Sequence, residues 1–258
     1  MITLLTDFGT RDPFAGILKG VIAGINPEAD VVDLTHEIPP QDIRRAALVL
    51  GDSYRHFPKG TIFLCVIDPG VGTPRRPLCV QAGEHFFIGP DNGTFTVPII
   101  EHPTATRAWE ITSSKYLLPI RGGTFHGLDI FAPAAAWLSR DIEPWELGPE
   151  STEAPVLIDI PKPDRRGGVI TGEVVMIDRF GNAITNIRAS DIKGMEITAV
   201  AVRDKSLSLV AHYAAASGAA AVLNSEGRVE IFVCMGSAEG VLGVAVGDVV
   251  TVSSAGAA

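Results

Sequence analysis

The stretch Thr61–Ile67 (TIFLCVI), followed at once by Asp68–Arg75 (DPGVGTPR), decides how the first half of this chain folds. The apolar run predicts a strand, and the Pro and Gly residues after it predict where that strand ends. The loop that follows carries one carboxylate, Asp68, and one guanidinium, Arg75. In α/β proteins such loops hold ligands and catalytic groups, although Asp before Pro-Gly is also common in plain surface turns.

Strands and helices alternate on both sides of this stretch, up to about residue 160. Strands are predicted at Ile2–Leu5, Val31–Leu34 and Thr61–Ile67, helices at Phe14–Ile25, Asp42–Tyr54 and Asp129–Ser139, and a hairpin at Leu78–Gln81 and His85–Ile88. Asp12 is expected to cap the first helix, with Pro13 in its first position. This order predicts the α/β fold class, with an N-terminal α/β domain over residues 1–160 built on a largely parallel central sheet.

The character of the sequence changes at Pro161–Gly168 (PKPDRRGG), where Pro, Gly and charged residues cluster as they do in linkers. Beyond it the predicted strands are short and separated by turns: Val169–Ile177, Ala183–Ile187, Ile197–Val202, Ser206–Val210, Arg228–Val233 and Asp248–Ser253. Only Tyr213–Val222 suggests a helix. The pattern indicates a small barrel or sandwich, and we expect a C-terminal all-β barrel domain over residues 168–258.

Composition argues against several classes of function. The net charge of −9 disfavours nucleic acid as a partner, because nucleic-acid binding needs basic patches. No apolar run reaches the ~20 residues that span a bilayer, and the acid at Asp7 comes too early for a signal peptide. Cys65, Cys79 and Cys234 show neither disulfide nor metal spacing. We therefore expect a cytoplasmic protein with reduced cysteines, no metal and no membrane partner.

Histidine is the side chain most suited to proton transfer near neutral pH, and His126 is the most informative of the six. It lies in Gly122–Asp129 (GGTFHGLD), where three glycines in six residues are costly unless the backbone must bend sharply. His36 is the second candidate, and it can equally be a satisfied loop residue. Surface or turn positions are expected for the others: His56, His85, His102 and His212.

Two further polar stretches have both a functional and a plain structural interpretation. Asp7, directly after the first strand, can accept hydrogen bonds from ribose hydroxyls or belong to a turn before a helix. In Asp178–Asn182 (DRFGN), Phe180 can stack on a ligand and Asn182 can pair with a purine edge, or the segment is an ordinary hairpin turn. The chain contains no G-x-G-x-x-G, P-loop or H-E-x-x-H motif, so Rossmann cofactors, P-loop hydrolysis and zinc catalysis lose support.

Taken in order, these stretches resemble the S-adenosylmethionine (SAM) hydroxide adenosyltransferases, also called SAM hydrolases, whose halide-using relatives are the fluorinases and chlorinases. The matching motifs run through the whole chain: LLTDFG at 4–9, VDLTHE at 32–37, VIDPGVG at 66–72, GPDNG at 89–93, TFHG at 124–127, DIFAP at 129–133, DRFGN at 178–182 and NSEGRVE at 224–230. None is diagnostic alone, and their order and spacing carry the resemblance. The family fold, an α/β domain joined to a β-barrel, matches the break near residue 165.

The resemblance implies an enzyme that hydrolyses SAM to adenosine and L-methionine by attack of an activated water on the ribose C5′, with no cofactor. The Asp/Arg/His triad of the family falls on Asp68, Arg75 and His126, and the halide-using relatives lack this triad. The arginine would stabilise developing hydroxide, while Asp68 and His126 would orient the water and take its proton. Which of the two finally accepts the proton stays open.

The resemblance also assigns the substrate contacts, at Asp7 (ribose hydroxyls), Asp178 (methionine ammonium), Phe180 (stacking), Asn182 (adenine), Ser225 (methionine carboxylate) and Met235 (adenine amine, through its carbonyl). Family members resemble trimers, which implies a homotrimer whose active sites lie where one chain's N-terminal domain meets a neighbour's C-terminal domain.

The sequence departs from the family pattern at three positions. Leu128 stands where an arginine is usual, Glu226 where the halogenating relatives have an arginine for the substrate carboxylate, and Cys234 where asparagine is usual. Two alternative functions therefore remain beside the hydrolase. One is a halide-using 5′-halo-adenosine synthase, and the other is a non-catalytic protein that binds adenosine or SAM.

Overall fold

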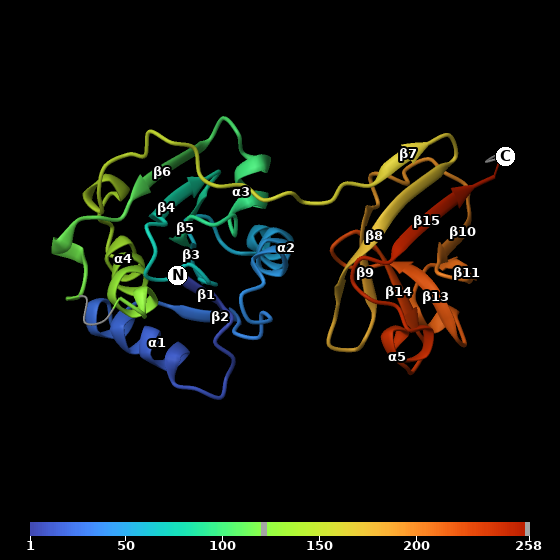
Figure 1. Cartoon of the computed structure of the whole chain (residues 1–258), viewed down its shortest axis with the longest axis horizontal. Helices are drawn as coiled ribbons and strands as arrows, with labels where there is room; N and C mark the ends of the chain where they lie inside the picture. The colour runs from blue at the N-terminus through green and yellow to red at the C-terminus, as the bar shows by residue number, and fades with distance from the viewer. Residues whose placement is uncertain (120–122, 256–258) are drawn as a thin grey trace. The chain divides into compact units, whose positions relative to one another are not determined.

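The computed structural model describes residues 1–119 and 123–255, and the chain divides into two compact units, Met1–Ile158 and Asp159–Ala258 (Figure 1). Gly122, the first glycine of the predicted Gly122–Asp129 segment, lies outside the described residues. Within the described ranges, none of the helices has the length and apolar character that a membrane span requires.

The first unit is built on a six-stranded sheet with the strand order β2-β1-β3-β5-β4-β6. Its strands are β1 (Ile2–Thr6), β2 (Val31–Thr35), β3 (Ile62–Val66), β4 (Pro77–Ala82), β5 (His85–Pro90) and β6 (Thr106–Glu110). β2, β1, β3 and β5 are parallel to one another, whereas β4 runs antiparallel to both β5 and β6. The prediction of a largely parallel sheet is therefore only partly right, and the sheet is mixed. The short turn at Gly83 is the reason, because it joins β4 and β5 as the predicted hairpin and so reverses the chain.

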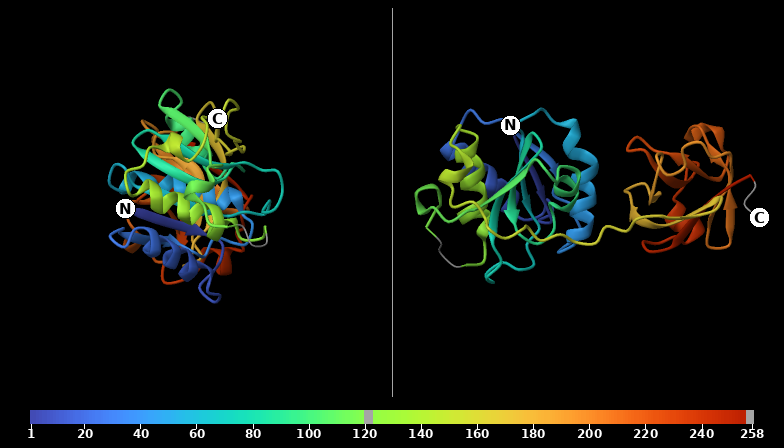
Figure 2. Two further views of the ribbon diagram at one scale, coloured as in Figure 1. Left: turned by 90° about the vertical axis from the view of Figure 1, so that its left-hand side faces the viewer. Right: turned by 90° about the horizontal axis from the view of Figure 1, so that it is seen from above.

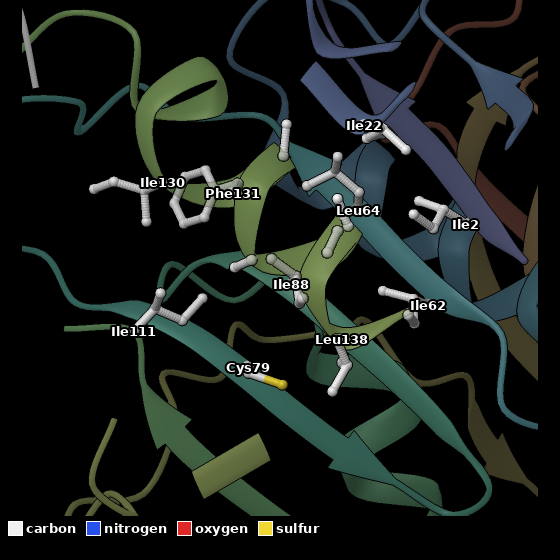
Figure 3. Packing of buried hydrophobic residues seen from close by; sticks show 14 of the residues in the cluster. Ile2, Ile22, Ile62, Leu64, Cys79, Ile88, Ile111, Ile130, Phe131 and Leu138 are labelled. Carbon is white, nitrogen blue, oxygen red and sulfur yellow. The ribbon is translucent and has the colours of Figure 1, made fainter. Parts of the chain in front are cut away.

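Helices cover both faces of this sheet, so the unit has three layers (Figure 2). They are α1 (Phe14–Ile25), α2 (Ile43–Ser53), α3 (Thr96–Glu101) and α4 (Ala132–Leu138). One face packs against α1 and α4 through residues such as Leu64, Ile22 and Leu138, all nearly or fully buried (Figure 3). The other face packs against α2 and α3. Because both faces are buried, β1 and β3 consist of buried residues only.

The helix ends differ in part from the predictions. Pro13 occupies the N-cap of α1 and no side chain caps the helix, so Asp12 does not have the predicted capping role. Asp42 does cap α2, accepting a hydrogen bond from the backbone N–H of Arg45 at 2.8 Å. The predicted helix from Asp129 instead begins with a π-helical turn, Gly127–Phe131, which continues into α4. Such turns often occur at functional sites.

The second unit is a nine-stranded, nearly closed, barrel-like sheet in the order β11-β10-β15-β8-β9-β14-β13-β12, with β7 paired to β8. The strands are β7 (Asp164–Arg166), β8 (Val169–Ile177), β9 (Ala183–Arg188), β10 (Ile197–Val202), β11 (Lys205–Leu207), β12 (Leu209–Val210), β13 (Ala219–Leu223), β14 (Arg228–Val233) and β15 (Val249–Ser254). β11 and β12, the two ends of this order, are separated in sequence by Ser208 alone, which brings the sheet close to closure. One short helix, α5 (Ala238–Leu242), accompanies the strands.

The helix suggested at Tyr213–Val222 is wrong. The segment forms a short 3₁₀ turn, Tyr213–Ala215, and then strand β13, which pairs with β14. Alternate residues of β13 pack on opposite sides: Ala221 joins the main core of the unit, and Ala220 joins a smaller cluster with Phe232. Pairing and burial on both faces therefore override the helix propensity of the alanines.

Candidate functional site

The loop Asp68–Arg75 lies at the carboxyl end of β3. β1 is the neighbouring parallel strand, and its carboxyl end lies beside that of β3. The register pairs Thr6 with Val66, so Asp7 and Asp68 follow adjacent parallel strands at one sheet edge. Gly72 adopts a φ of +80°, and a Cβ there would lie 3.0 Å from the carbonyl oxygen of Gly123. This close approach requires glycine, and it seats the loop against the segment that leads to His126.

Asp68, Arg75 and His126 are in direct contact. The Arg75 Nε donates to Asp68 Oδ1 at 2.9 Å, and its Nη2 donates to the second carboxylate oxygen. The same Nη2 lies 2.6 Å from His126 Nδ1. The side chains of Arg75 and Asp68 are only 10% and 7% exposed, and the Arg75 guanidinium lies 5.2 Å from the centre of the Phe131 ring. The cluster is thus a forked ion pair, largely withdrawn from water, with an imidazole attached to it.

The contact with Arg75 fixes the protonation of His126. A guanidinium can only donate hydrogen bonds, so Nδ1 must accept, and the proton of the neutral ring is on Nε2. Burial, together with the Arg75 cation, holds the pKa of His126 below its usual value. At neutral pH the His126 imidazole beside the Asp68–Arg75 ion pair is therefore neutral.

Aromatic rings hold the loops of this sheet edge together. Phe8, directly after Asp7, lies 5.8 Å from Phe125, directly before His126, and Phe14 of α1 lies 5.4 Å from Phe125. The Asp7 carboxylate accepts a hydrogen bond from the Gln41 N–H at 2.8 Å. The segments that carry Asp7 and His126 are thus joined by a cluster of three phenylalanines that was not predicted from the sequence. The available signal was that an aromatic residue adjoins each of the two candidate polar residues.

Two other histidines are structural. His36 is buried, with Nδ1 2.8 Å from the Thr6 hydroxyl and Nε2 3.0 Å from Asp33 Oδ1, as the loop interpretation required. His85 was expected at a surface or turn position, and this expectation is wrong, because it begins β5 and is buried against the rings of Tyr54 and Phe63.

In the second unit, Asp178–Asn182 forms the turn between β8 and β9. The Asp178 carboxylate accepts from the N–H groups of Phe180 and Asn182, at 2.8 and 2.9 Å, and from the Asn182 side chain at 3.2 Å. Phe180 remains 76% exposed. Glu239 donates its N–H to the carbonyl of Gly181, which brings the fully exposed Met235 segment beside this turn. Asp178, Phe180, Asn182 and Met235 therefore share one region of the unit.

Ser225 lies elsewhere. It is exposed in the turn that precedes β14, whereas Met235 follows the other end of that strand. Between them, Glu230 of β14 is 3% exposed and accepts a hydrogen bond from the Tyr213 hydroxyl at 2.7 Å. Burial raises the pKa of Glu230 above its usual value, and Asp178 and Glu226 add to the rise. This buried carboxylate went unnoticed in the sequence because it alternates with apolar residues in a strand.

Among residues 1–119 and 123–255, no three His, Cys, Asp or Glu side chains are grouped so as to hold a metal ion. Cys65 and Cys79 are buried and unpaired in the first unit, and burial raises the pKa of the Cys79 thiol to about 12.

Comparison with known proteins gives consistent matches over both units. A family model described as the SAM hydroxide adenosyltransferase N-terminal domain matches residues 2–148, and the corresponding C-terminal domain matches residues 172–251. An (R)-S-adenosyl-L-methionine hydrolase of Thermus thermophilus is 37% identical, over 94% of this chain and 95% of its own length. A fluorinase of an Actinoplanes species is 29% identical over 75% of this chain and 73% of its own. The crystal structure of an uncharacterized conserved protein from Thermotoga maritima superposes with a TM-score of 0.92 at 32% identity, covering 98% of this chain and 100% of that one.

The electrostatic coupling of the cluster can be measured on His126 itself. Replacement of Arg75 by glutamine (Arg75→Gln) should raise the pKa of His126, because it removes the neighbouring cation and leaves the Asp68 carboxylate unpaired. The measurement is an NMR titration of the ring protons, assigned by comparison with His126→Asn. Arg107→Gln, in the exposed Arg107–Glu150 pair, is the control and should leave the midpoint unchanged. An unchanged or lower midpoint in Arg75→Gln would contradict the coupling.

Proposed function

Since this chain belongs to the SAM hydroxide adenosyltransferase family, we propose that it hydrolyses S-adenosyl-L-methionine to adenosine and L-methionine through Asp68, Arg75 and His126. The observation that carries the assignment of residues is the forked Asp68–Arg75 pair in contact with His126, in a loop at the carboxyl end of β3. Such sheet edges are where open α/β sheets bind their ligands.

The reaction needs help only on the side of the nucleophile. A lone pair of the water oxygen forms the bond to C5′, the C5′–S bond breaks, and its electron pair goes to the sulfonium sulfur. Methionine therefore leaves neutral at sulfur, and no acid or cofactor is required for it. The water must lose a proton, and its pKa in bulk is about 15.7. Holding it in line behind C5′ supplies a proximity contribution that can reach about 7–11 kcal/mol.

The contacts of the cluster suggest a role for each group. The Arg75 cation stabilises hydroxide character as it develops on the water. His126 accepts from Arg75 at Nδ1, so its Nε2–H is a donor that can orient the water oxygen. Asp68 accepts one bond from Arg75 at each oxygen and keeps lone pairs on both, so we assign it as the acceptor of the water proton.

Water fits this cluster better than a halide. The carboxylate of Asp68 neutralises the charge of Arg75, and His126 is neutral at pH 7, so the three groups together offer no net positive charge to an anion. The comparisons support the same choice, because the hydrolase relative is both more similar and more completely covered than the fluorinase.

We propose further that Asp7 binds the ribose hydroxyls, while Asp178, Phe180, Asn182, Ser225 and Met235 of the second unit contact the methionine and adenine groups. These residues belong to different units, and Phe180 and Met235 are exposed side chains that a ligand can cover. Active sites shared between neighbouring copies in a homotrimer would unite the two sets.

The proposed activity is tested by chromatography of SAM incubated with purified protein. Equal amounts of adenosine and L-methionine should form, and added chloride or fluoride should give no 5′-halo-adenosine. His126→Ala purified in the same way is the control for contaminating enzymes. Adenosine no higher than in that control would contradict the hydrolase assignment, and a halogenated product would favour the halide-using alternative.

The three roles predict a loss of turnover without a loss of binding. Arg75→Ala, Asp68→Asn and His126→Ala should each lower kcat by about 10²–10³-fold, as expected for removal of an electrostatic or proton-transfer group. Adenosine binding, measured by calorimetry, should stay close to that of the unaltered protein because the ribose and adenine contacts are assigned to other residues. Arg107→Ala removes an exposed ion pair and serves as the control. Weaker adenosine binding with unchanged turnover of bound SAM would contradict the roles.

The shared active site is tested by co-expression of two inactive variants, His126→Ala and Asp178→Ala. In a trimer with sites between copies, an unaltered first unit and an unaltered second unit meet at some interfaces, so activity should partly return. Each variant alone should remain inactive. If the co-expressed pair is as inactive as the single variants, each site is built from one chain only.

A further inference from the structure

The segment Gly89–Gly93 (GPDNG) begins with the last two residues of β5 and holds the Asp68–Arg75 loop at both ends. At the first end, the side-chain amide of Asn92 donates to the carbonyl oxygen of Ile67, the fully buried residue before Asp68, at 2.8 Å. The Asn92 oxygen accepts from the N–H and the hydroxyl of Thr94, at 3.2 and 2.8 Å. These acceptor contacts fix which end of the amide faces Ile67.

At the second end, Asp91 holds Arg76, the residue directly after Arg75. One carboxylate oxygen of Asp91 accepts from Nε and Nη2 of Arg76, at 2.9 and 2.6 Å. The backbone N–H of Asp91 also donates to the carbonyl of Arg76 at 2.9 Å. The two side chains are 17% and 5% exposed, for Arg76 and Asp91 respectively, so this ion pair is screened far less than a surface pair.

The same carboxylate ties the loop to the chain that leaves the first unit. The second oxygen of Asp91 accepts from the N–H of Val156 at 2.7 Å, and Arg76 also donates to the carbonyl of Ala154 at 3.0 Å. Gly93 packs against Ile158, the last residue of the unit, because a Cβ at Gly93 would lie 2.4 Å from the Ile158 side chain. Asp91 therefore has partners on both oxygens, and all of them are fixed parts of the unit.

We propose that Asp91 and Asn92 are positioning residues, which set the distance and orientation of Asp68 and Arg75. They do so by fixing Ile67, the residue before Asp68, and Arg76, the residue after Arg75. The inference rests on the proposed hydrolase function. The hydrogen bonds described for the two residues go to Ile67, Thr94, Arg76 and Val156, so they reach Asp68 and Arg75 through neighbouring residues. Their effect is geometric: displacement of a catalytic group by about 1 Å can cost up to about a hundredfold in rate.

The decisive variant is Asn92→Asp, which keeps the shape and the acceptor for Thr94 but replaces the donor to Ile67 with an oxygen. The chain offers a matched control in Asn26, at the end of α1. Its side-chain oxygen accepts from the N–H of Glu28 at 3.2 Å, and its amide donates to the carbonyl and to the hydroxyl oxygen of Ser139, at 3.2 and 2.9 Å. Asn26→Asp thus makes the same chemical change at a site remote from the cluster.

We expect Asn92→Asp to lower kcat by between about ten- and a hundredfold, with KM for SAM and the affinity for adenosine within about twofold of the unaltered protein. Asn26→Asp should lose a similar amount of thermal stability and keep its kcat. Hydrogen exchange supplies a readout that is independent of activity: amides of residues 68–76 should exchange faster in Asn92→Asp and not in Asn26→Asp. Asp91→Asn, which loses the ion pair with Arg76, should behave as Asn92→Asp does.

An unchanged kcat in Asn92→Asp, or an equal loss in Asn26→Asp, would overturn the positioning role while the hydrolase function stands. If the unaltered protein forms no adenosine, the proposed hydrolase function is wrong. The role of Asn92 is then still decided by hydrogen exchange at the amides of residues 68–76. Equal exchange in Asn92→Asp and the unaltered protein would then reject it.

Discussion

The first unit depends on one constraint, which is that the Arg75 guanidinium must be shared between a carboxylate and an imidazole away from water. Charged groups withdrawn from solvent are stable only when their hydrogen bonds are well made. Asp68 meets this need with both oxygens and His126 with Nδ1, while the Phe131 ring covers the guanidinium. Asp68 lies in the same loop as Arg75, whereas His126 and Phe131 belong to the segment of the π-helical turn. The glycine at position 72, the π-helical turn and the phenylalanine cluster all serve to bring those parts within reach.

The fold was predictable where local pattern and tertiary packing agree. The buried strand at 62–66 and the β4–β5 hairpin follow from apolar runs and turn residues. The sheet was predicted to be largely parallel from the alternation of strands and helices. The β4–β5 hairpin nevertheless reverses the chain, so β4 is antiparallel to β5. The prediction for β13 was wrong because its alanines have a high helix propensity. Pairing with β14 makes the segment a strand, and that pairing is not visible in the local sequence.

The candidate site was likewise predictable only where local sequence was sufficient. Spacing alone places Asp68 and Arg75 in one loop, but the contact with His126 depends on the sheet bringing separate loops to one edge. The burial of Glu230 and His85 could not be predicted, because burial of a polar side chain depends on neighbours that are distant in sequence. The contacts of Asp91 and Asn92 also depend on residues that are distant in sequence. Their motif is visible in the sequence, but its purpose emerges only from the two ends of the loop that it holds.

The departures from the family pattern can now be weighed against these contacts. Leu128 lies in the π-helical turn, and the groups that set the pKa of His126 are Arg75, Asp68 and Asp129, together with burial. The contacts of Arg75 with Asp68 and His126 are thus made with leucine at position 128. Glu226 is exposed in the turn before β14, and the nearby Arg228 does not present its charge at the surface there: its residue is 4% exposed and it donates inward to the carbonyl of Thr185 at 3.4 Å.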